Sequence, residues 1–422
     1  MKYEIYKNDC YNLYTIKTEK FKNCHMEIVF KNKCSRENIT NSLLLFDMLL
    51  ENSKDHPSKR EMIKSMQSLY NLNLYSVTSR VGGMLLSNIV ADFLDPKYMK
   101  KDSLEKIIEF TFSTIFNPNV DNESFDEETY EIVYKRIKNE IESIKEDPKQ
   151  ECILNALKKL DKNSPYAMSM SGDEEILKNL SPKKLYDFYK ELMESSPIDI
   201  YIIGNLDMKE IDKLIRKNIH LNSIKTQKIK LYLEDINAKK TKEFSDKKDL
   251  TDINLVQIYA LKNLDDYETD YVMPVWNAIW GSLSLESKLY KTIRGKYGLC
   301  YNLTSYYQKY DRMLLLHTSI DEANYNKTKR LIRACYEDMK RGNITEDELN
   351  NVKNIIINTL YLIYDSPSKL IDNYLFKNIA NLPDIEKRID EFKKITLDDL
   401  IKTSEKIKLV VNYKLGGTNA KN

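Results

Sequence analysis

Histidine is scarce in this chain of 422 residues, and its spacing excludes one common kind of metal site. The four histidines are His25, His56, His220 and His317, and the closest two lie 31 residues apart. A helical zinc site needs two histidines four residues apart, because that spacing places both imidazoles on one face. The chain therefore cannot build a helical zinc site of its own.

Cysteine pairs and long apolar runs are also missing. The six cysteines include no CxxC pair, which argues against a thiolate zinc site or a small disulfide framework. No run approaches 18 apolar residues, so no membrane-spanning helix is expected. The start, MKYEIYKND, has no apolar core, so we expect no secretory signal peptide. These absences favour the reducing cytoplasm as the location.

The chain also lacks a large net excess of positive or negative charge, and it lacks nucleotide-binding motifs. The chain has 66 Lys and Arg against 64 Asp and Glu, a net charge of +2, whereas a dedicated nucleic-acid binder shows a basic excess. Neither G-x-G-x-x-G nor a P-loop is present, so a nucleotide-binding fold has no support. Hydrophobic residues make up 42% and charged residues 31%, which is typical of a globular protein with a charged surface.

One order of elements occurs twice along the chain. Each half reads as a strand, an apolar helix, a hairpin, further helices, and a capped helix followed by a closing strand. In the first half these are residues 25–30, 42–50, 72–79 with 84–90, 125–144, the helix after Ser181-Pro182, and 198–203. In the second half they are residues 254–260, 271–280, 300–307 with 312–320, the helix after Thr396, and 407–413. The repetition indicates duplication.

Local signals support several of these elements. Gly82-Gly83 between two apolar strands is a strong hairpin signal. Ser181-Pro182 places an N-cap before Pro at the first helical position, and Thr396 with Asp399 resembles a capping box. Pro274 fits the first turn of the helix at 271–280.

The pattern predicts an α+β fold of two duplicated domains, each a largely antiparallel sheet with helices packed on one face. The first domain is expected at residues 1–220 and the second at 251–422. Residues 221–250 form the predicted linker region, and its polar tail, residues 238–248, is expected to be a solvated connection.

The segment Ser287–Tyr301, SKLYKTIRGKYGLCY, carries a resemblance to a known family. It resembles the signature S-R-L-F-x-x-I-R-E-x-x-G-L-A-Y of the insulinase/pitrilysin zinc-peptidase family. Arg294 and Tyr301 match the family's Arg–Tyr pair, whereas Gly295 replaces its usual Glu. The resemblance covers essentially the whole chain and implies the family's duplicated half-clamshell fold. The stretches EIESIKEDP and KNSPYAMSMSGDEE are similar to a Firmicutes pseudo-peptidase associated with elongation factor P modification.

The family's zinc motif, HxxEH, is degenerate in this chain. The matching stretch is LLLFDMLLENS, which places Leu43 and Asp47 at the two histidine positions and Phe46 at the position of the general-base Glu. Leu and Phe can neither bind zinc nor accept a proton. Glu140 is the nearest candidate for the third ligand, although a solvated helix glutamate is the simpler interpretation. We therefore expect no metal in this chain, and the resemblance implies that zinc belongs to a partner subunit.

The resemblance also implies a role for the Arg–Tyr pair. In the family these side chains reach the substrate at the zinc site. A Tyr301 hydroxyl can donate to the oxyanion of a tetrahedral intermediate, and the Arg294 fork can hold a peptide carbonyl. The alternative is structural: Arg294 complements a helix dipole, and Tyr301 is an ordinary strand residue.

Three hypotheses for function follow. The first is a catalytically incomplete subunit of a heterodimeric zinc metallopeptidase, which cleaves peptides with an HxxEH-bearing partner of similar length. The second is a non-catalytic peptide-binding or scaffolding protein, which is able to form a homodimer. The third, a self-sufficient enzyme with unrelated chemistry, has no support, because no cysteine has a visible base or orienting partner.

Overall fold

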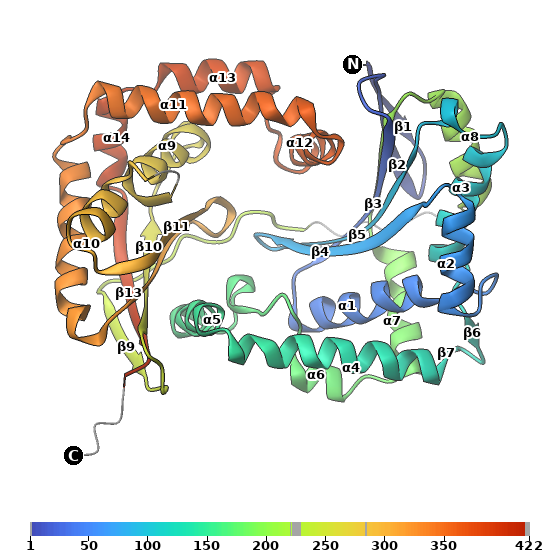
Figure 1. Ribbon diagram of the computed structural model, residues 1–422, viewed down its shortest axis with the longest axis horizontal. Helices are drawn as coiled ribbons and strands as arrows, with labels where there is room; N and C mark the ends of the chain where they lie inside the picture. Colours follow the sequence, from blue (N-terminus) through green and yellow to red (C-terminus); the bar gives the residue numbers. More distant parts are fainter. Residues whose placement is uncertain (1, 220, 222–228, 283–284, 418–422) are drawn as a thin grey trace. The chain divides into compact units, whose positions relative to one another are not determined.

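The computed structural model describes residues 2–219, 221, 229–282 and 285–417 (Figure 1). His220 and part of the predicted linker region lie outside the described residues. The chain forms two compact units, each assembled from three segments. The first unit contains Met1–Ser143, Ser169–Leu231 and Asp365–Phe376, and the second contains Ile144–Met168, Tyr232–Tyr364 and Lys377–Asn422.

The first unit is built on a mixed sheet with the order β1-β2-β8-β3-β5-β4. Strands β2 and β8 are parallel, and the other neighbouring pairs are antiparallel. The strands are β1 (Lys2–Lys7), β2 (Tyr11–Lys17), β8 (Ile198–Gly204), β3 (Asn23–Lys33), β5 (Met84–Leu94) and β4 (Asn73–Val81). Gly82-Gly83 turns the chain between β4 and β5 as predicted, and Gly82 has a φ of +56°.

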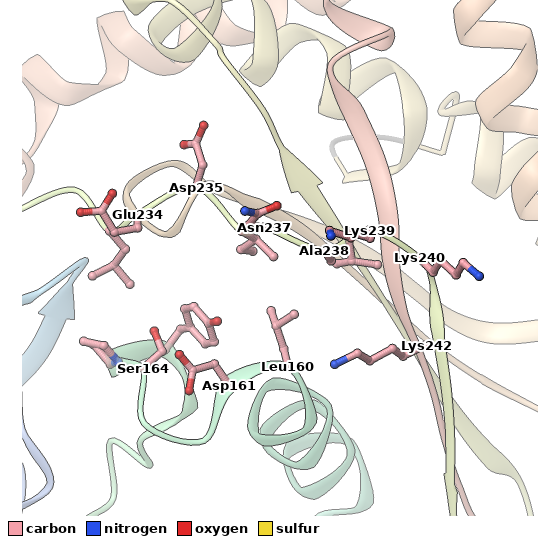
Figure 2. Close-up of a pocket in the computed structure, with 15 residues that line it drawn as sticks. Leu160, Asp161, Ser164, Glu234, Asp235, Asn237, Ala238, Lys239, Lys240 and Lys242 are labelled. Atoms are coloured by element: carbon pink, nitrogen blue, oxygen red, sulfur yellow. The ribbon is translucent and has the colours of Figure 1, made fainter.

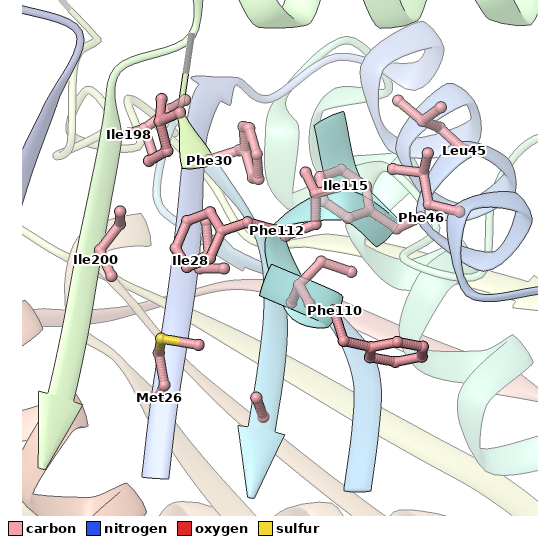
Figure 3. Packing of buried hydrophobic residues seen from close by; sticks show 14 of the residues in the cluster. Met26, Ile28, Phe30, Leu45, Phe46, Phe110, Phe112, Ile115, Ile198 and Ile200 are labelled. Carbon is pink, nitrogen blue, oxygen red and sulfur yellow. The ribbon is translucent and has the colours of Figure 1, made fainter. Parts of the chain in front are cut away.

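Helices pack against one face of this sheet and enclose an apolar core (Figure 3). The helices of the unit are α1 (Arg36–Glu51), α2 (Lys59–Ser68), α3 (Ser103–Phe116), α4 (Glu127–Ser143), α6 (Glu174–Lys178), α7 (Pro182–Ser195) and α8 (Met208–Asn218). A short hairpin, β6 (Val120–Asp121) with β7 (Ser124–Phe125), precedes α4. Ser35 caps α1 and Ser181 caps α7 through their side-chain oxygens, as N-cap chemistry requires.

The second unit is built on a sheet with the order β11-β12-β10-β13-β9. Its strands are β9 (Lys242–Asp246), β10 (Ile253–Leu261), β11 (Cys300–Gln308), β12 (Met313–Ile320) and β13 (Ile407–Leu415). All neighbours are antiparallel except β9 and β13. Its longer helices are α10 (Tyr325–Lys340), α11 (Glu346–Tyr361), α13 (Ile385–Lys394) and α14 (Leu397–Ser404), and the predicted capping box at Thr396 and Asp399 is present. These helices share one apolar core with the sheet.

Strand β10 is buried along its whole length, because the second sheet is covered on both faces. Leu255 and Tyr259 face the core with the helices α10, α11, α13 and α14. Val256 and Ile258 face a second apolar cluster that includes Cys152 of α5 (Pro148–Asp161). A helix from the first half of the sequence thus supplies the second cover, and this adds a layer to the predicted arrangement of helices on one face. Conversely, helix α12 (Pro367–Ala380) comes from the second half of the sequence, and its residues up to Phe376 belong to the first unit.

Two local predictions need correction. The polar stretch 238–248 is not a solvated connection throughout, because residues Lys242–Asp246 form β9 and pair in parallel with β13. The helix expected at 271–280 is a longer helical run, in which a π-helix at Glu268–Val272 precedes α9 (Met273–Asn277) and another π-helix follows at Ala278–Ser282. Pro274 therefore lies within the run instead of at its start. Proline has no N–H to donate, and a wider turn accommodates it.

Candidate functional site

The three residues at the degenerate zinc-motif positions all lie on α1, where Phe46 belongs to the apolar core and Leu43 packs against it. Phe46 is 1% exposed, and its ring packs edge-on against Phe30 at a centroid distance of 5.3 Å (Figure 3). Leu43 is partly buried and packs against the same core. Asp47 is the polar member of the three, with a side chain that is 25% exposed. The first helix has therefore become a packing element.

Asp47 forms an ion pair with Arg136. The Arg136 guanidinium on α4 lies 2.9 Å from the Asp47 carboxylate and 3.0 Å from that of Glu51. The Ser76 hydroxyl donates a further hydrogen bond to Asp47 over 3.2 Å. Hydrogen bonds to Glu51 and the negative charges of Asp47 and Glu51 outweigh the burial of Arg136 and raise its pKa. A fixed side-chain cation thus neutralises the carboxylates at the position where the family carries its metal motif.

Glu140, the candidate third ligand, does not complete a metal site. The residue is on the exposed face of α4. Its carboxyl is nevertheless partly desolvated by its neighbours, and this desolvation, with the nearby negative charge of Asp47, raises its pKa. Within the described part of the chain, no group of three or more His, Cys, Asp or Glu residues is arranged to hold a metal ion. The residues present at the degenerate motif therefore do not fit zinc.

Replacing Arg136 by Met tests this ion-pair network. We expect the free energy of unfolding at pH 7 to fall by about 1–2 kcal/mol, because the change leaves Asp47 and Glu51 without their shared cation in a partly solvated site. Urea unfolding followed by circular dichroism measures the loss. The single variant Asp47→Asn and the double variant Arg136→Met/Asp47→Asn are measured in the same way. The double variant should recover part of the stability lost in Arg136→Met. If the double variant is less stable by the sum of the two single losses, the two side chains are not coupled.

Arg294 and Tyr301 lie close together in the second unit. A π-helix at Tyr290–Lys296 carries Arg294, and Tyr301 is the second residue of β11. Between them Gly298, with a φ of +60°, turns the chain and donates its N–H to the Arg294 carbonyl. Tyr301 therefore lies in the strand expected at residues 300–307, and the helix that carries Arg294 is a π-helix that continues to Lys296.

The Arg294 side chain is fixed by contacts within the protein, whereas the Tyr301 side chain is not. The Arg294 Nη1 donates to the Tyr301 carbonyl over 2.9 Å, and its guanidinium stacks on the Tyr290 ring at 5.0 Å. The Tyr301 side chain is on the surface, and the residue is 82% exposed. No other described residue bonds to its phenol hydroxyl. The arginine is thus pre-positioned beside a tyrosine whose donor is free to contact another molecule.

A second polar cluster surrounds His25 on β3. Its Nδ1 lies 2.5 Å from Asp92 and its Nε2 lies 2.9 Å from Glu27, which also accepts a hydrogen bond from Asn88. Burial would lower the pKa of His25, but the hydrogen bonds to Asp92 and Glu27 outweigh it and raise the pKa to about 9. The residue is 4% exposed, a packed position at the start of the strand expected at residues 25–30. Charged residues at alternate strand positions, His25 and Glu27, were the available signal for the cluster.

The other buried histidine has the opposite character. His317 on β12 is 2% exposed, and its Nε2 lies 2.8 Å from the Asn254 side-chain oxygen. Burial, with the nearby positive charge of Lys149, lowers the pKa of His317 to about 4. It is therefore a neutral packing residue at pH 7, within the strand expected at residues 312–320.

Comparison with known proteins identifies relatives along the whole chain. Residues 179–356 match the family described as "Peptidase M16 inactive domain". The "Probable inactive metalloprotease YmfF" of Bacillus subtilis is 24% identical over 413 residues, which cover 96% of this chain and 95% of that protein.

Solved structures share the fold. A conserved protein from Enterococcus faecalis superposes with a TM-score of 0.91 at 22% identity, over 100% of both chains. A peptidase M16 inactive domain from Pseudomonas fluorescens gives a TM-score of 0.78 at 14% identity, also over 100% of both chains. A protease from Helicobacter pylori gives 0.77 at 14% identity, over 99% of both chains. The predicted α+β fold of the family is confirmed.

None of the helices in the described ranges combines the length and the apolar character that crossing a membrane requires. The finer similarity to a pseudo-peptidase associated with elongation factor P modification stays a prediction. The family resemblance carried by Ser287–Tyr301 is supported by these relatives: residues 179–356 match an M16 inactive domain, and nearly the whole chain is similar to a probable inactive metalloprotease. The chain itself contains no HxxEH.

Proposed function

We propose that this chain is the Arg–Tyr subunit of a heterodimeric zinc metallopeptidase that cleaves peptides. One observation carries the proposal: Arg294 is held against the Tyr301 backbone, while Tyr301 is 82% exposed and has a free hydroxyl. A buried Tyr301 whose hydroxyl was bonded within the chain would have indicated a structural role. The metal-motif positions, by contrast, hold an ion pair and core residues.

The chemistry assigned to this chain is substrate positioning and oxyanion stabilisation. The Tyr301 hydroxyl donates to the oxygen that becomes negatively charged when a peptide carbonyl is attacked. Arg294 uses Nη1 on the Tyr301 carbonyl, and its remaining N–H groups are available to a substrate carbonyl. The HxxEH-bearing partner would supply the zinc and the activated water, which this chain does not bind.

The alternative is a peptide-binding or scaffolding protein that cuts nothing, whether as a homodimer or as a subunit of an assembly. Strand β4 supports it, because β4 is at the edge of the first sheet and exposes Tyr75 and Val77. An unpaired strand edge can bind an extended peptide through main-chain hydrogen bonds, with side chains on alternate positions giving specificity.

Reconstitution separates the two functions. The chain is mixed with an HxxEH-bearing family member from the same host, and cleavage of an unstructured fluorogenic peptide is measured. The proposal predicts cleavage by the mixture and none by this chain alone. A mixture no more active than the partner alone, with peptide still bound by this chain, would favour the non-catalytic alternative.

A further inference from the structure

A cavity of about 860 Å³ in the second unit lies apart from the Arg294–Tyr301 segment (Figure 2). Its walls come from the C-terminal end of α5 and the turn that follows, the extended stretch Leu233–Lys240, the start of β9, and β13. No residue of the π-helix Tyr290–Lys296 or of β11 lines it. The volume lies within the range of roughly 300–1,000 Å³ that is usual for small-molecule sites.

Part of the cavity lining is apolar. Tyr166, Ile236 and Val410 line it, and all three belong to the apolar cluster between α5 and the second sheet. They are 9%, 8% and 1% exposed, so the cavity reaches the edge of the packed core. Such a surface is stabilised by an apolar group that excludes water from it.

One end of the cavity is cationic. Lys239, Lys240 and Lys242 line it, and in the described part of the chain none of their ammonium groups has a carboxylate partner. Figure 2 shows the Lys242 side chain extending toward Leu160, across the cavity.

The acidic residues of the lining, by contrast, are engaged within the protein. Asp235 lies 3.3 Å from Arg312, and Asp161 accepts the Asn163 N–H over 2.9 Å. Glu234 also has an interaction partner in the chain. At the lysine end of the cavity, by contrast, the described residues place no carboxylate against the ammonium groups.

We infer that this cavity binds an amphipathic organic anion. The carboxylate or phosphate of the ligand lies at the Lys242 end, where a charge-assisted hydrogen bond forms. Its apolar body covers Tyr166, Ile236 and Val410. Neither Arg294 nor Tyr301 is involved, so binding here is independent of the proposed peptidase role.

Isothermal titration calorimetry of the full chain tests the ligand class. Decanoate and decyl phosphate are the probes, and decanol and decyltrimethylammonium are the neutral and cationic comparators, all below micelle formation. We expect one site for an anion, with the neutral and cationic probes at least about tenfold weaker, because they lose the charge-assisted bond. The ratio of the two anion affinities distinguishes a carboxylate ligand from a phosphate ligand. Equal binding of decanol and decanoate, or binding of no probe, overturns the inference.

Variants locate the site. Lys242→Glu and Ala238→Trp should each weaken anion binding at least about tenfold, the first by charge reversal and the second by filling the cavity. Lys387→Glu, at an exposed position of α13, makes the same charge change elsewhere and should leave binding unchanged. Circular dichroism checks the fold of each variant. If Ala238→Trp does not fold, the comparison of Lys242→Glu with Lys387→Glu decides, and equal affinities would overturn the site.

Discussion

Replacing Tyr301 by Phe is expected to slow peptide cleavage by the reconstituted two-subunit peptidase by about 100- to 1,000-fold, the usual cost of losing one oxyanion donor. The change removes only the hydroxyl, which no other described residue bonds, so the fold should be unaffected. Because the oxyanion develops only when the carbonyl is attacked and is absent from the bound substrate, kcat should fall while KM changes little. Steady-state kinetics with saturating partner measures both.

Matched variants make the result specific. Tyr297 is 40% exposed in the same segment, and Tyr297→Phe should leave the rate unchanged. Arg294→Ala should raise KM as well as lower kcat, because Arg294 is assigned to positioning the substrate, and Arg294→Lys should recover little, since Lys lacks the planar fork. If the peptidase reconstituted with Tyr301→Phe cleaves as fast as the one reconstituted with Tyr297→Phe or with the unmodified chain, Tyr301 does not act on the partner's substrate.

Replacing His25 by Gln is expected to lower the free energy of unfolding by about 3–5 kcal/mol at pH 7, the usual cost of removing one partner from a buried ion pair. Glu27 is 5% exposed and would keep only its hydrogen bond from Asn88. Adding Glu27→Gln should recover a large part of the loss, because it removes the unpaired charge. Urea unfolding of the two variants and the unmodified chain measures these differences. A single variant as stable as the double variant would contradict a charged pair.

The pH dependence of stability gives a second readout of the same cluster. The folded pKa of His25, about 9, is above its ordinary value of 6.5. The stabilisation is therefore complete below about pH 6.5 and is lost as pH rises through 9, with a total of roughly 3 kcal/mol. Relative to the His25→Gln variant, the unmodified chain should lose its advantage between pH 7 and 10. A constant difference over that range would show that His25 is neutral in the folded protein.

Much of the fold was predictable because its signals are local. Gly82-Gly83, Ser181-Pro182 and the box at Thr396 and Asp399 each lie within a few residues, and each has the predicted structure. Strand β10 carried a hint of its double cover, since it is apolar almost without alternation. Its partner α5, however, lies about 100 residues earlier, and no local pattern identifies it.

Other features could not be predicted, because they leave no local pattern in the sequence. Strand β9 has the sequence KEFSD, and its pairing with β13 uses backbone groups that leave no apolar pattern. The ion pair of Asp47 with Arg136 joins positions 89 residues apart on two helices. The sequence showed only that Leu43 and Phe46 cannot bind zinc. Which charge neutralises Asp47 depends on how α1 packs against α4.

The zinc content of the purified chain, alone and in complex with its HxxEH-bearing partner, tests the central claim most directly. Both samples are saturated with zinc, dialysed, and measured by elemental analysis together with protein concentration. The account predicts no stoichiometric zinc in the isolated chain, because Leu43 and Phe46 are packed in the core and Asp47 is paired with Arg136. It predicts one zinc ion per heterodimer, held by the partner. Stoichiometric zinc bound by this chain alone would contradict the account.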